Sequence, residues 1–216
     1  MKNNLSPKIF RAILTIAMLL PVTLFANTQE PRLLIQEMSG QFENEMIEHQ
    51  SDIKKDLSIA DELIHKHLVP NVNFLLMSRY VLGKNWKKAD AAQQDEFVGL
   101  FKSLLIRFYS KAFVEYLKKH QIEKGMINIL PYRAKSGSKY AKVKTEITVE
   151  PGAPKVQVKY TLFNSKTKGW KIYDISVEGI SLVTSYRSSF KNIIAKEKIN
   201  GLLNHLKKKL KQTALE

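Results

Sequence analysis

Cysteine is absent from the 216-residue sequence, and this excludes disulfide bonds, thiol catalysis, cysteine-ligated metals and a lipid anchor on cysteine. The sequence also lacks a glycine-rich loop of the kind that binds nucleotide phosphates. It has no internal repeat and, after the N-terminus, no apolar run long enough to cross a bilayer. With 44% apolar residues, the chain is predicted to form one globular domain.

The first 26 residues follow the order of a secretory signal peptide. Basic residues without an acidic residue come first, then the apolar run of residues 12–20, then Pro21 and the small Ala26. The run is too short to span a bilayer comfortably, so we expect cleavage, which leaves residues 27–216 as the mature domain. An uncleaved anchor is the alternative. A secreted protein without disulfides is typical of the periplasm of a Gram-negative bacterium.

Basic residues outnumber acidic residues by 35 to 20, which gives a net charge of +15. The signal peptide carries three of the basic residues and no acidic residue, so its removal leaves a net charge of +12. Such a charge attracts anionic surfaces, which are nucleic acid in the cytosol and lipid headgroups or acidic protein faces outside it. The signal peptide argues against a basic nucleic-acid-binding module, which is the weaker alternative.

Residues 30 to about 120 have helical patterns, beginning with Pro31 at the first turn of a helix. A short apolar helix is predicted to end at Gly83, and Asp90 is predicted to cap the longest helix, which has a wide aromatic face. After the helix that begins at Pro31 and before the one that ends at Gly83, apolar residues at three- and four-residue steps predict one helix that runs to Pro70: Ile53, Leu57, Ala60 and Ile64.

Residues from about 121 to 178 have strand patterns. After a short first strand, three longer strands alternate apolar and polar residues, which is typical of an antiparallel sheet with one buried face. On the last strand, the alternation places Tyr173, Ile175 and Val177 on one face. It places Trp170 and Ile172 on the opposite face.

Two amphipathic helices are predicted to follow, over about residues 181–214. The predicted fold class is therefore α+β, with helices first, then a curved antiparallel sheet, then helices on one face of it. The apolar faces of the sheet and of the long helix form a core if they pack tightly. If the sheet curves away, they enclose an apolar cavity.

Two residue groups that could carry chemistry lack a convincing geometry. His65 and His67 are two residues apart, and such residues do not face one another on a helix, so two surface histidines are expected rather than a metal site. Asp174 and Glu178 are about 13 Å apart along a strand, too far to share one bond-breaking event. Ser181 is expected to cap the following helix.

Two basic segments remain open to two interpretations each. The segment "RYVLGKNWKKA" offers Arg79, Lys84, Lys87 and Lys88 to a phosphate or a membrane surface, or it is a solvated turn. The segment "HLKKKLK" near the C-terminus is expected to be a solvated helix face, with docking on an acidic partner or membrane as the alternative.

Several stretches, in order, resemble the MlaC, or toluene-tolerance, family of periplasmic phospholipid-binding proteins. The most specific are "RYVLGKNW" and "YDISVEGISLVTSYRSSF", and the resemblance runs from about Pro31 to Ala195. It implies an NTF2-like curved sheet with extra helices around a deep apolar cavity for phospholipid tails. It also implies a carrier without enzymatic activity, cofactor or metal.

The resemblance further implies the partners. The carrier would move lipid between an outer-membrane lipoprotein–porin complex and an inner-membrane ABC transporter with a lipid-binding ring. Contact with these membrane proteins would be transient, without insertion into the membrane.

Residues on the apolar faces are predicted to form the lipid-binding wall. The inward positions of the sheet and helices are Phe74, Met77, Phe101, Leu105, Phe108, Val143, Ile147, Val149, Val156, Val158, Tyr160, Ile175, Val183 and Tyr186. For Arg187, a structural ion pair is preferred to a headgroup contact. A cavity enzyme of the isomerase or hydratase type, using Tyr173 and Asp174, is the alternative, but strand alternation directs Asp174 away from the inward face.

Overall fold

The computed structural model describes residues 30–133, 135 and 137–212, so the predicted signal peptide lies outside the described residues. The helical elements are α2 (Pro31–Ile53), α3 (Leu57–Leu63), a π-helical turn (Ile64–Leu68), a 3₁₀ turn (Val69–Asn71), α4 (Phe74–Leu82), a second 3₁₀ segment (Gly83–Lys88), α5 (Ala91–Lys119) and α6 (Leu182–Gln212). The strands are β1 (Ile127–Ile129), β2 (Tyr140–Ile147), β3 (Val156–Ser165), β4 (Gly169–Val177) and β5 (Ile180–Ser181). This order confirms the predicted α+β class. Within the described ranges, no helix is long and apolar enough to cross a membrane.

Local signals set the ends of three helices where the sequence predicted them. Pro31 is the first residue of α2. Asp90 accepts a hydrogen bond from the N–H of Gln93, whose side chain accepts one from the N–H of Asp90, and this reciprocal pair caps α5. Gly83 ends α4 with a φ of 55°, a conformation that favours glycine.

The chain bends between α2 and α3, where the apolar spacing predicted one continuous helix. Ile53 is the last residue of α2, and Asp56 caps α3 by accepting a 2.8 Å hydrogen bond from the N–H of Ser58. The apolar stripe continues across the bend because both helices bury that side in one cluster, which contains Ile53 and Ala60. The single-helix prediction was wrong because spacing reports the buried side of the chain and not the continuity of its backbone.

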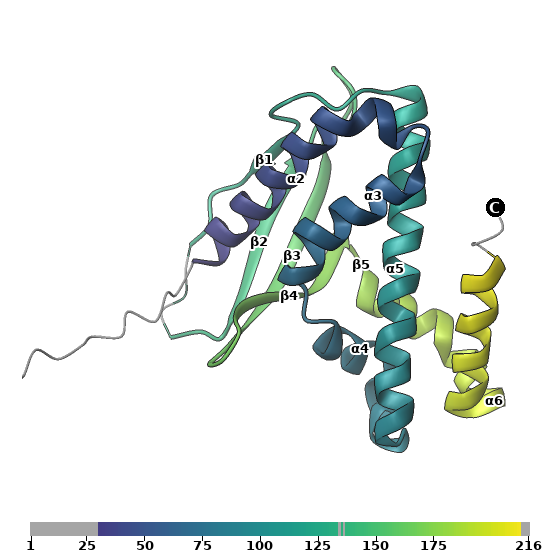
Figure 1. The fold of residues 1–216 in the computed structure, drawn as a ribbon. Helices are drawn as coiled ribbons and strands as arrows, with labels where there is room; N and C mark the ends of the chain where they lie inside the picture. The colour runs from purple at the N-terminus through teal and green to yellow at the C-terminus, as the bar shows by residue number, and fades with distance from the viewer. Residues whose placement is uncertain (1–29, 134, 136, 213–216) are drawn as a thin grey trace, which may run out of the picture.

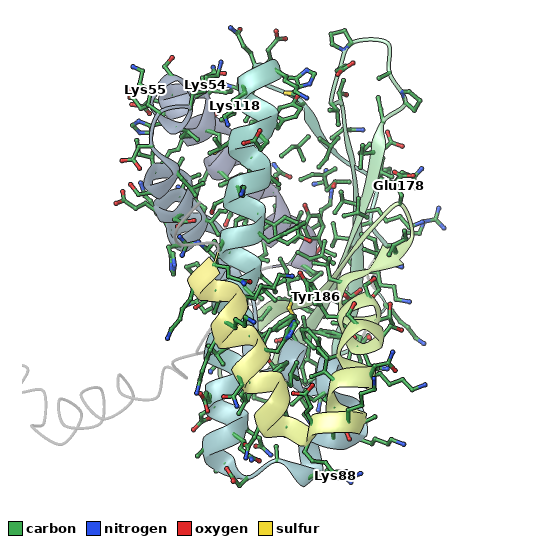
Figure 2. The ribbon with its side chains drawn as sticks, turned by 90° about the vertical axis from the view of Figure 1, so that its right-hand side faces the viewer. Lys54, Lys55, Lys88, Lys118, Glu178 and Tyr186 are labelled. Atoms are coloured by element: carbon green, nitrogen blue, oxygen red, sulfur yellow. The ribbon has the colours of Figure 1, made fainter. Side chains whose placement is uncertain are left out.

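The five strands form an antiparallel meander in the order β1-β2-β3-β4-β5. In its middle, Val143 lies opposite Tyr160, and Tyr160 lies opposite Ile175. Helices α2, α3 and α5 all lie on one side of the sheet (Figures 1 and 2). On the other face of β2, Lys142 and Lys144 are exposed, so the predicted one-sided burial is confirmed for this strand.

A β-bulge in β4 overturns the predicted alternation of that strand. Pairing with β3 shifts between Thr161 and Leu162, and Tyr173 is the extra residue that has no partner in the register. The bulge returns Ile172 to the same face as Ile175, although the two are three residues apart. Tyr173 instead stacks on the ring of Tyr80, with 5.2 Å between the ring centroids.

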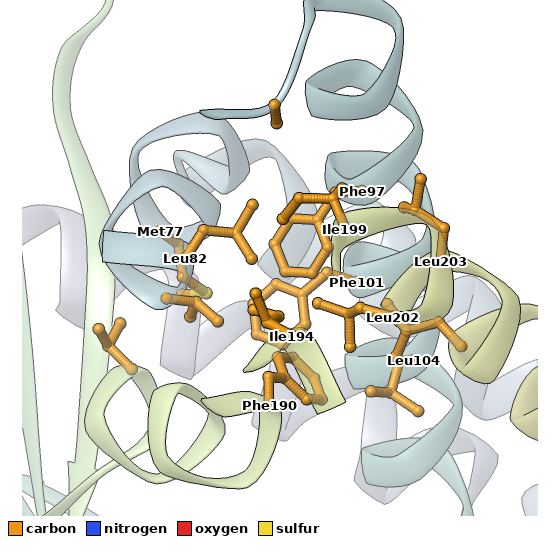
Figure 3. Close-up of a cluster of buried hydrophobic side chains, with 14 of the residues drawn as sticks. Met77, Leu82, Phe97, Phe101, Leu104, Phe190, Ile194, Ile199, Leu202 and Leu203 are labelled. Atoms are coloured by element: carbon orange, nitrogen blue, oxygen red, sulfur yellow. The ribbon is translucent and has the colours of Figure 1, made fainter. Parts of the chain in front are cut away.

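Helix α6 bends sharply at Lys198, whose φ of 61° and ψ of −165° are not helical, so its two halves correspond to the two predicted C-terminal helices. The residues of α4, α5 and both halves of α6 pack together in a cluster that we call the aromatic core. There Phe97 and Phe101 stack with their centroids 5.5 Å apart, and the ring of Phe190 meets both edge-on (Figure 3).

Candidate functional site

A cavity of about 450 Å³ lies between the sheet and the helices. Its walls come from α2, the π-helical turn, α4, α5 and the inner face of the sheet. In Figure 2, α5 and the sheet face one another across a space that side chains from both elements enter. The volume is in the range of pockets that hold small-molecule ligands.

The helical walls consist of apolar side chains at four-residue spacing. On α2 these are Met38, Phe42 and Met46, which share one face because four residues complete about one turn. On α5, Tyr109 and Phe113 have the same spacing and also line the cavity. The ring centroids of Phe42 and Phe113 are 5.3 Å apart, so α2 and α5 meet along one edge of the cavity.

The sheet supplies the opposite wall, and the β-bulge shapes it. Tyr160 of β3 and both Ile172 and Ile175 of β4 line the cavity. Strict alternation would turn either Ile172 or Ile175 to the outer face, so the bulge adds one apolar side chain to the wall. Near one end, the Tyr116 hydroxyl donates a 2.7 Å hydrogen bond to the Val149 carbonyl, which ties α5 to the segment that follows β2.

Few polar groups reach this cavity. Among the described residues that line it, Ser39 and Glu43 are the two that are neither apolar nor aromatic. Both are occupied, since Ser39 Oγ donates to the Ile35 carbonyl at 2.6 Å and Glu43 accepts from the N–H of Ile127 at 3.3 Å. Burial raises the pKa of Tyr109 to about 12, so its phenol is uncharged at neutral pH. Water finds few partners in such a space, which therefore suits a ligand with long apolar groups.

The structure divides the predicted wall residues into two groups. Eight of them line the cavity: Phe74, Met77, Leu105, Ile147, Val149, Val158, Tyr160 and Ile175. Six do not: Phe101, Phe108, Val143, Val156, Val183 and Tyr186. A contact between any of these fourteen residues and a ligand stays a prediction.

The six residues lie elsewhere for identifiable reasons. Phe101 and Val183 are buried in the aromatic core, where the ring of Tyr186 meets that of Phe101 edge-on at 5.1 Å. Val143 is fully buried between the sheet and α2, and Val156 packs beside the same cluster. Phe108 is 57% exposed, although the periodicity of α5 placed it with the inward residues. An apolar position on an inward face is therefore not by itself a cavity position.

Helix α2 is the wall that the sequence prediction missed. Its Met38, Phe42 and Met46 recur at a strict spacing of four, so the signal of a buried face was present. That signal is the same for a helix in a solid core and for a helix over a cavity. Only the position of α2 over the inner face of the sheet separates the two cases (Figure 1).

Asp174 and Ser181 build a corner between β4 and α6. Asp174 accepts a 2.7 Å hydrogen bond from Ser181 Oγ and a 3.1 Å hydrogen bond from the N–H of Val183. Ser181 Oγ in turn accepts from the N–H of Thr184 at 3.1 Å, which confirms its predicted role as a helix cap. The carboxylate and the hydroxyl therefore accept hydrogen bonds from backbone N–H groups in the first turn of α6.

The same corner removes the basis for the enzyme alternative. Neither Tyr173 nor Asp174 lines the cavity, because the bulge turns Tyr173 toward Tyr80 and the start of α6 engages Asp174. Glu178 lies in the turn between β4 and β5, where its side chain accepts a hydrogen bond from the N–H of Gln157. Its carboxylate therefore also has a structural partner.

Arg187 joins α6 to the end of α4. Its Nε donates a 2.9 Å hydrogen bond to the Tyr80 carbonyl, and its Nη2 donates to the same oxygen. Tyr80 lies in the last turn of α4, where carbonyls lack partners within the helix. The role is structural, but the partner is a backbone carbonyl and not the carboxylate that an ion pair requires. This contact also unites the two segments that most resemble the MlaC family.

His67 is buried, contrary to the expectation of two surface histidines. It is 7% exposed, and its Nε2 lies 3.0 Å from Glu45 Oε2, while Lys66 Nζ lies 2.6 Å from Glu45 Oε1. Glu45 thus holds the π-helical turn against α2. In the part of the chain that the structure describes, no group of three or more histidine, cysteine or acidic residues could hold a metal ion.

Comparisons with known proteins agree with this architecture. A model of the MlaC protein family matches residues 36–208. The intermembrane phospholipid transport system binding protein MlaC of Haemophilus influenzae is 24% identical over 197 residues, which are 91% of this chain and 89% of that protein. The toluene tolerance protein Ttg2D of Pseudomonas putida is 25% identical over 181 residues, which are 83% of this chain and 80% of that protein.

A solved structure shares the fold. It is a phospholipid-binding protein from Ralstonia solanacearum in complex with a phospholipid. It superposes with a TM-score of 0.74 at 25% sequence identity and covers 85% of this chain and 98% of that chain.

Proposed function

The chain belongs to the MlaC family, and on this premise we propose that it is a periplasmic carrier that binds phospholipid and takes part in its transport between membranes. It acts by binding and release and not by catalysis. The observation that carries the proposal is the cavity of about 450 Å³, whose lining is almost wholly apolar. The phospholipid held by the related Ralstonia solanacearum protein supports the same ligand class.

The energetics of acyl chains require a deep site. Each methylene group removed from water contributes about 0.8 kcal/mol of favourable free energy. Exposing two chains of roughly 16 carbons to water would therefore cost on the order of 25 kcal/mol. A shallow groove leaves most of this apolar area in water, whereas a cavity between two layers of the fold covers it. Lipid therefore leaves only where a partner offers a continuous apolar path. The headgroup stays near water, because the cavity offers it few polar partners.

The donor and acceptor are inferred to be membrane complexes. We assign these roles to an outer-membrane lipoprotein–porin complex and an inner-membrane ABC transporter with a lipid-binding ring. The signal-peptide order of the first 26 residues and the net charge of +12 after its removal support export and attraction to acidic partners. The chain has no nucleotide-binding loop, so the energy that sets the direction of transport comes from a partner.

Within the cavity, we place the acyl chains between two walls. One consists of Met38 and Phe42 on α2 together with Met77 on α4, and the other includes Tyr160 and Ile175 on the sheet. Methionine adapts its shape to irregular apolar ligands, which fits a carrier that must release its cargo.

A pair of adjacent substitutions tests this proposal. Val158 lines the cavity, whereas its neighbour Lys159 points to the other face of β3, so tryptophan fills the cavity only at position 158. We expect native mass spectrometry to find phospholipid on the wild-type protein after purification or after incubation with phospholipid vesicles. Val158→Trp should lose most of this lipid, and Lys159→Trp should keep it. Circular dichroism checks that both variants fold.

Two results would overturn the carrier function. One is a folded wild-type protein that neither retains phospholipid nor takes it up from vesicles. The other is a folded Val158→Trp variant that holds as much phospholipid as the wild type.

A further inference from the structure

A second hollow, of about 460 Å³, lies at the bend of α6, and we call it the lysine cleft. Lys84 and Lys88 line it from the 3₁₀ segment after α4, and Lys191 and Lys198 line it from α6. None of its lining residues lines the apolar cavity. In Figure 2, Lys88 lies at the end of the molecule where α6 bends, far from Lys118 at the opposite end.

The backbone around the cleft has a defined shape. The bend at Lys198 sets the two halves of α6 at an angle, so residues of both halves line the cleft. The bend is tight, because a Cβ atom at Gly201 would collide with the side chain of Glu197. Across the cleft, Gln93 Nε2 donates a 2.8 Å hydrogen bond to Asn200 Oδ1, which ties the start of α5 to the second half of α6.

The charge of the cleft is not balanced by the residues that line it. No carboxylate is among its lining residues, and none of its four lysines forms an ion pair with another described residue. Two acidic side chains close by in sequence have other partners, since Asp90 caps α5 and Glu96 pairs with Lys207 at 2.5 Å. The side chain of a third, Glu197, lies over Gly201. Four exposed lysine side chains therefore line one hollow, and an anion bound there would reduce the repulsion between their charges.

We propose that the lysine cleft is a binding site for a phosphate group. Lysine is a common phosphate-binding residue and acts as a compact point charge, and four lysines line the cleft. The side-chain amides of Asn85 and Asn200 add donors. The second half of α6 begins at the cleft, so the positive end of its dipole lies there as well.

This site goes beyond lipid carriage and does not rest on it. The phosphate can belong to a soluble compound or to a phospholipid headgroup at a membrane surface. In the second case, the cleft would bind the carrier to the surface of an anionic bilayer, at a site distinct from the apolar cavity. The chemistry at the cleft is the same for both sources, and the experiment has one arm for each.

The test is a titration of inorganic pyrophosphate followed by amide NMR. The result expected is a set of shifts confined to residues 84–93 and 191–201. Lys84→Gln combined with Lys191→Gln should weaken binding by about tenfold or more, because two charge-assisted contacts are lost. Lys142→Gln combined with Lys144→Gln is the matched control, since it removes the same charge from the outer face of the sheet and should change binding less than about twofold.

Sedimentation with vesicles distinguishes the two sources. The protein is first saturated with phospholipid and then mixed with phosphatidylcholine vesicles that contain or lack phosphatidylglycerol. A headgroup source predicts binding to the anionic vesicles that pyrophosphate displaces and that the Lys84/Lys191 variant loses. A soluble source predicts pyrophosphate binding with vesicle association unaffected by that variant.

Three results would overturn the phosphate site. These are an absence of shifts at the cleft, equal losses of affinity in the two double variants, and tighter binding of a hexaglutamate peptide than of pyrophosphate at the same residues. The last result would assign the cleft to an acidic protein partner.

Discussion

The two ends of α5 carry similar apolar and aromatic side chains but face different surroundings. Toward its start, Phe97 and Phe101 are fully buried in the aromatic core (Figure 3). Toward its end, Tyr109 and Phe113 border the cavity of about 450 Å³. The difference lies in what packs against each end, since α4 and the bent α6 fill the space at the first and the curved sheet leaves it open at the second.

One helix thus contributes to a filled core at one end and to the wall of a cavity at the other. Close packing gives the aromatic core its full set of dispersion contacts, so this end holds the fold together. Side chains at the other end lack partner atoms on the cavity side, and in our proposal a bound ligand supplies them. The apolar area that the fold leaves uncovered is thus available to an acyl chain.

The largest expected effect is at the packed end. Phe101→Ala should lower the free energy of unfolding by about 3–5 kcal/mol, because it opens a void in a filled core. Phe113→Ala, on the same helix at the cavity, should cost less than half of that in the lipid-free protein. Urea denaturation of both variants checks this. Equal losses would mean that the cavity end is as tightly packed as the core.

The next effect concerns the corner that attaches α6 to the sheet. Asp174→Ala leaves Ser181 Oγ and the N–H of Val183 without their acceptor, which should cost about 1–3 kcal/mol of stability. Phospholipid content, measured by mass spectrometry on the folded variant, should remain at the wild-type level because Asp174 lies outside the cavity. Loss of lipid at unchanged stability would place this carboxylate in the binding site instead.

A smaller effect is expected where α6 meets α4. Arg187→Gln removes the charged donor from the Tyr80 carbonyl and should cost about 1 kcal/mol, since the contact is exposed. Arg187→Lys, which keeps the charge without the fork, should recover part of this loss in thermal melts. A headgroup contact predicts the reverse pattern, with unchanged melting and reduced phospholipid content.

The smallest effect is a pH dependence where α2 meets the π-helical turn. Hydrogen bonds from Lys66 and then from His67 hold the pKa of Glu45 below its ordinary value of 4.5. A carboxylate with a lowered folded-state pKa stabilises the fold above its unfolded pKa, and this stabilisation disappears as the pH falls through the folded value. The wild type should therefore lose more melting temperature than Glu45→Gln in the acid range below about pH 4.5. An equal fall in melting temperature in the two proteins over this pH range would contradict the prediction.

Residue patterns predicted the element types well because caps and periodicity are local. The Asp90 capping box, Gly83 and the Ser181 cap all act within a few residues of the helix end they define. The bulge at Tyr173 depends instead on how β4 pairs with β3. The apolar spacing continues across the bend after Ile53, where the cap at Asp56 marks the start of the next helix. Neither the bulge nor the bend can be obtained from the spacing within a single segment.

The cavity itself was only partly predictable. Val158 and Phe101 are both apolar, inward and buried, yet only Val158 borders the cavity. The distinction arises from the curvature of the sheet and the position of α2, which are properties of the assembled fold. The family resemblance supplied the expectation of a cavity, and the structure supplied its walls.

Photochemical labelling tests the central claim most directly. A phospholipid with a diazirine near the end of an acyl chain would be loaded and irradiated, and the adducts would be mapped by peptide mass spectrometry. Adducts should fall on the cavity walls, at Met38–Met46, Tyr109–Tyr116 and Ile172–Val177. Adducts confined to the aromatic core around Phe101 and Phe190, or to the outer face of the sheet, would contradict the account.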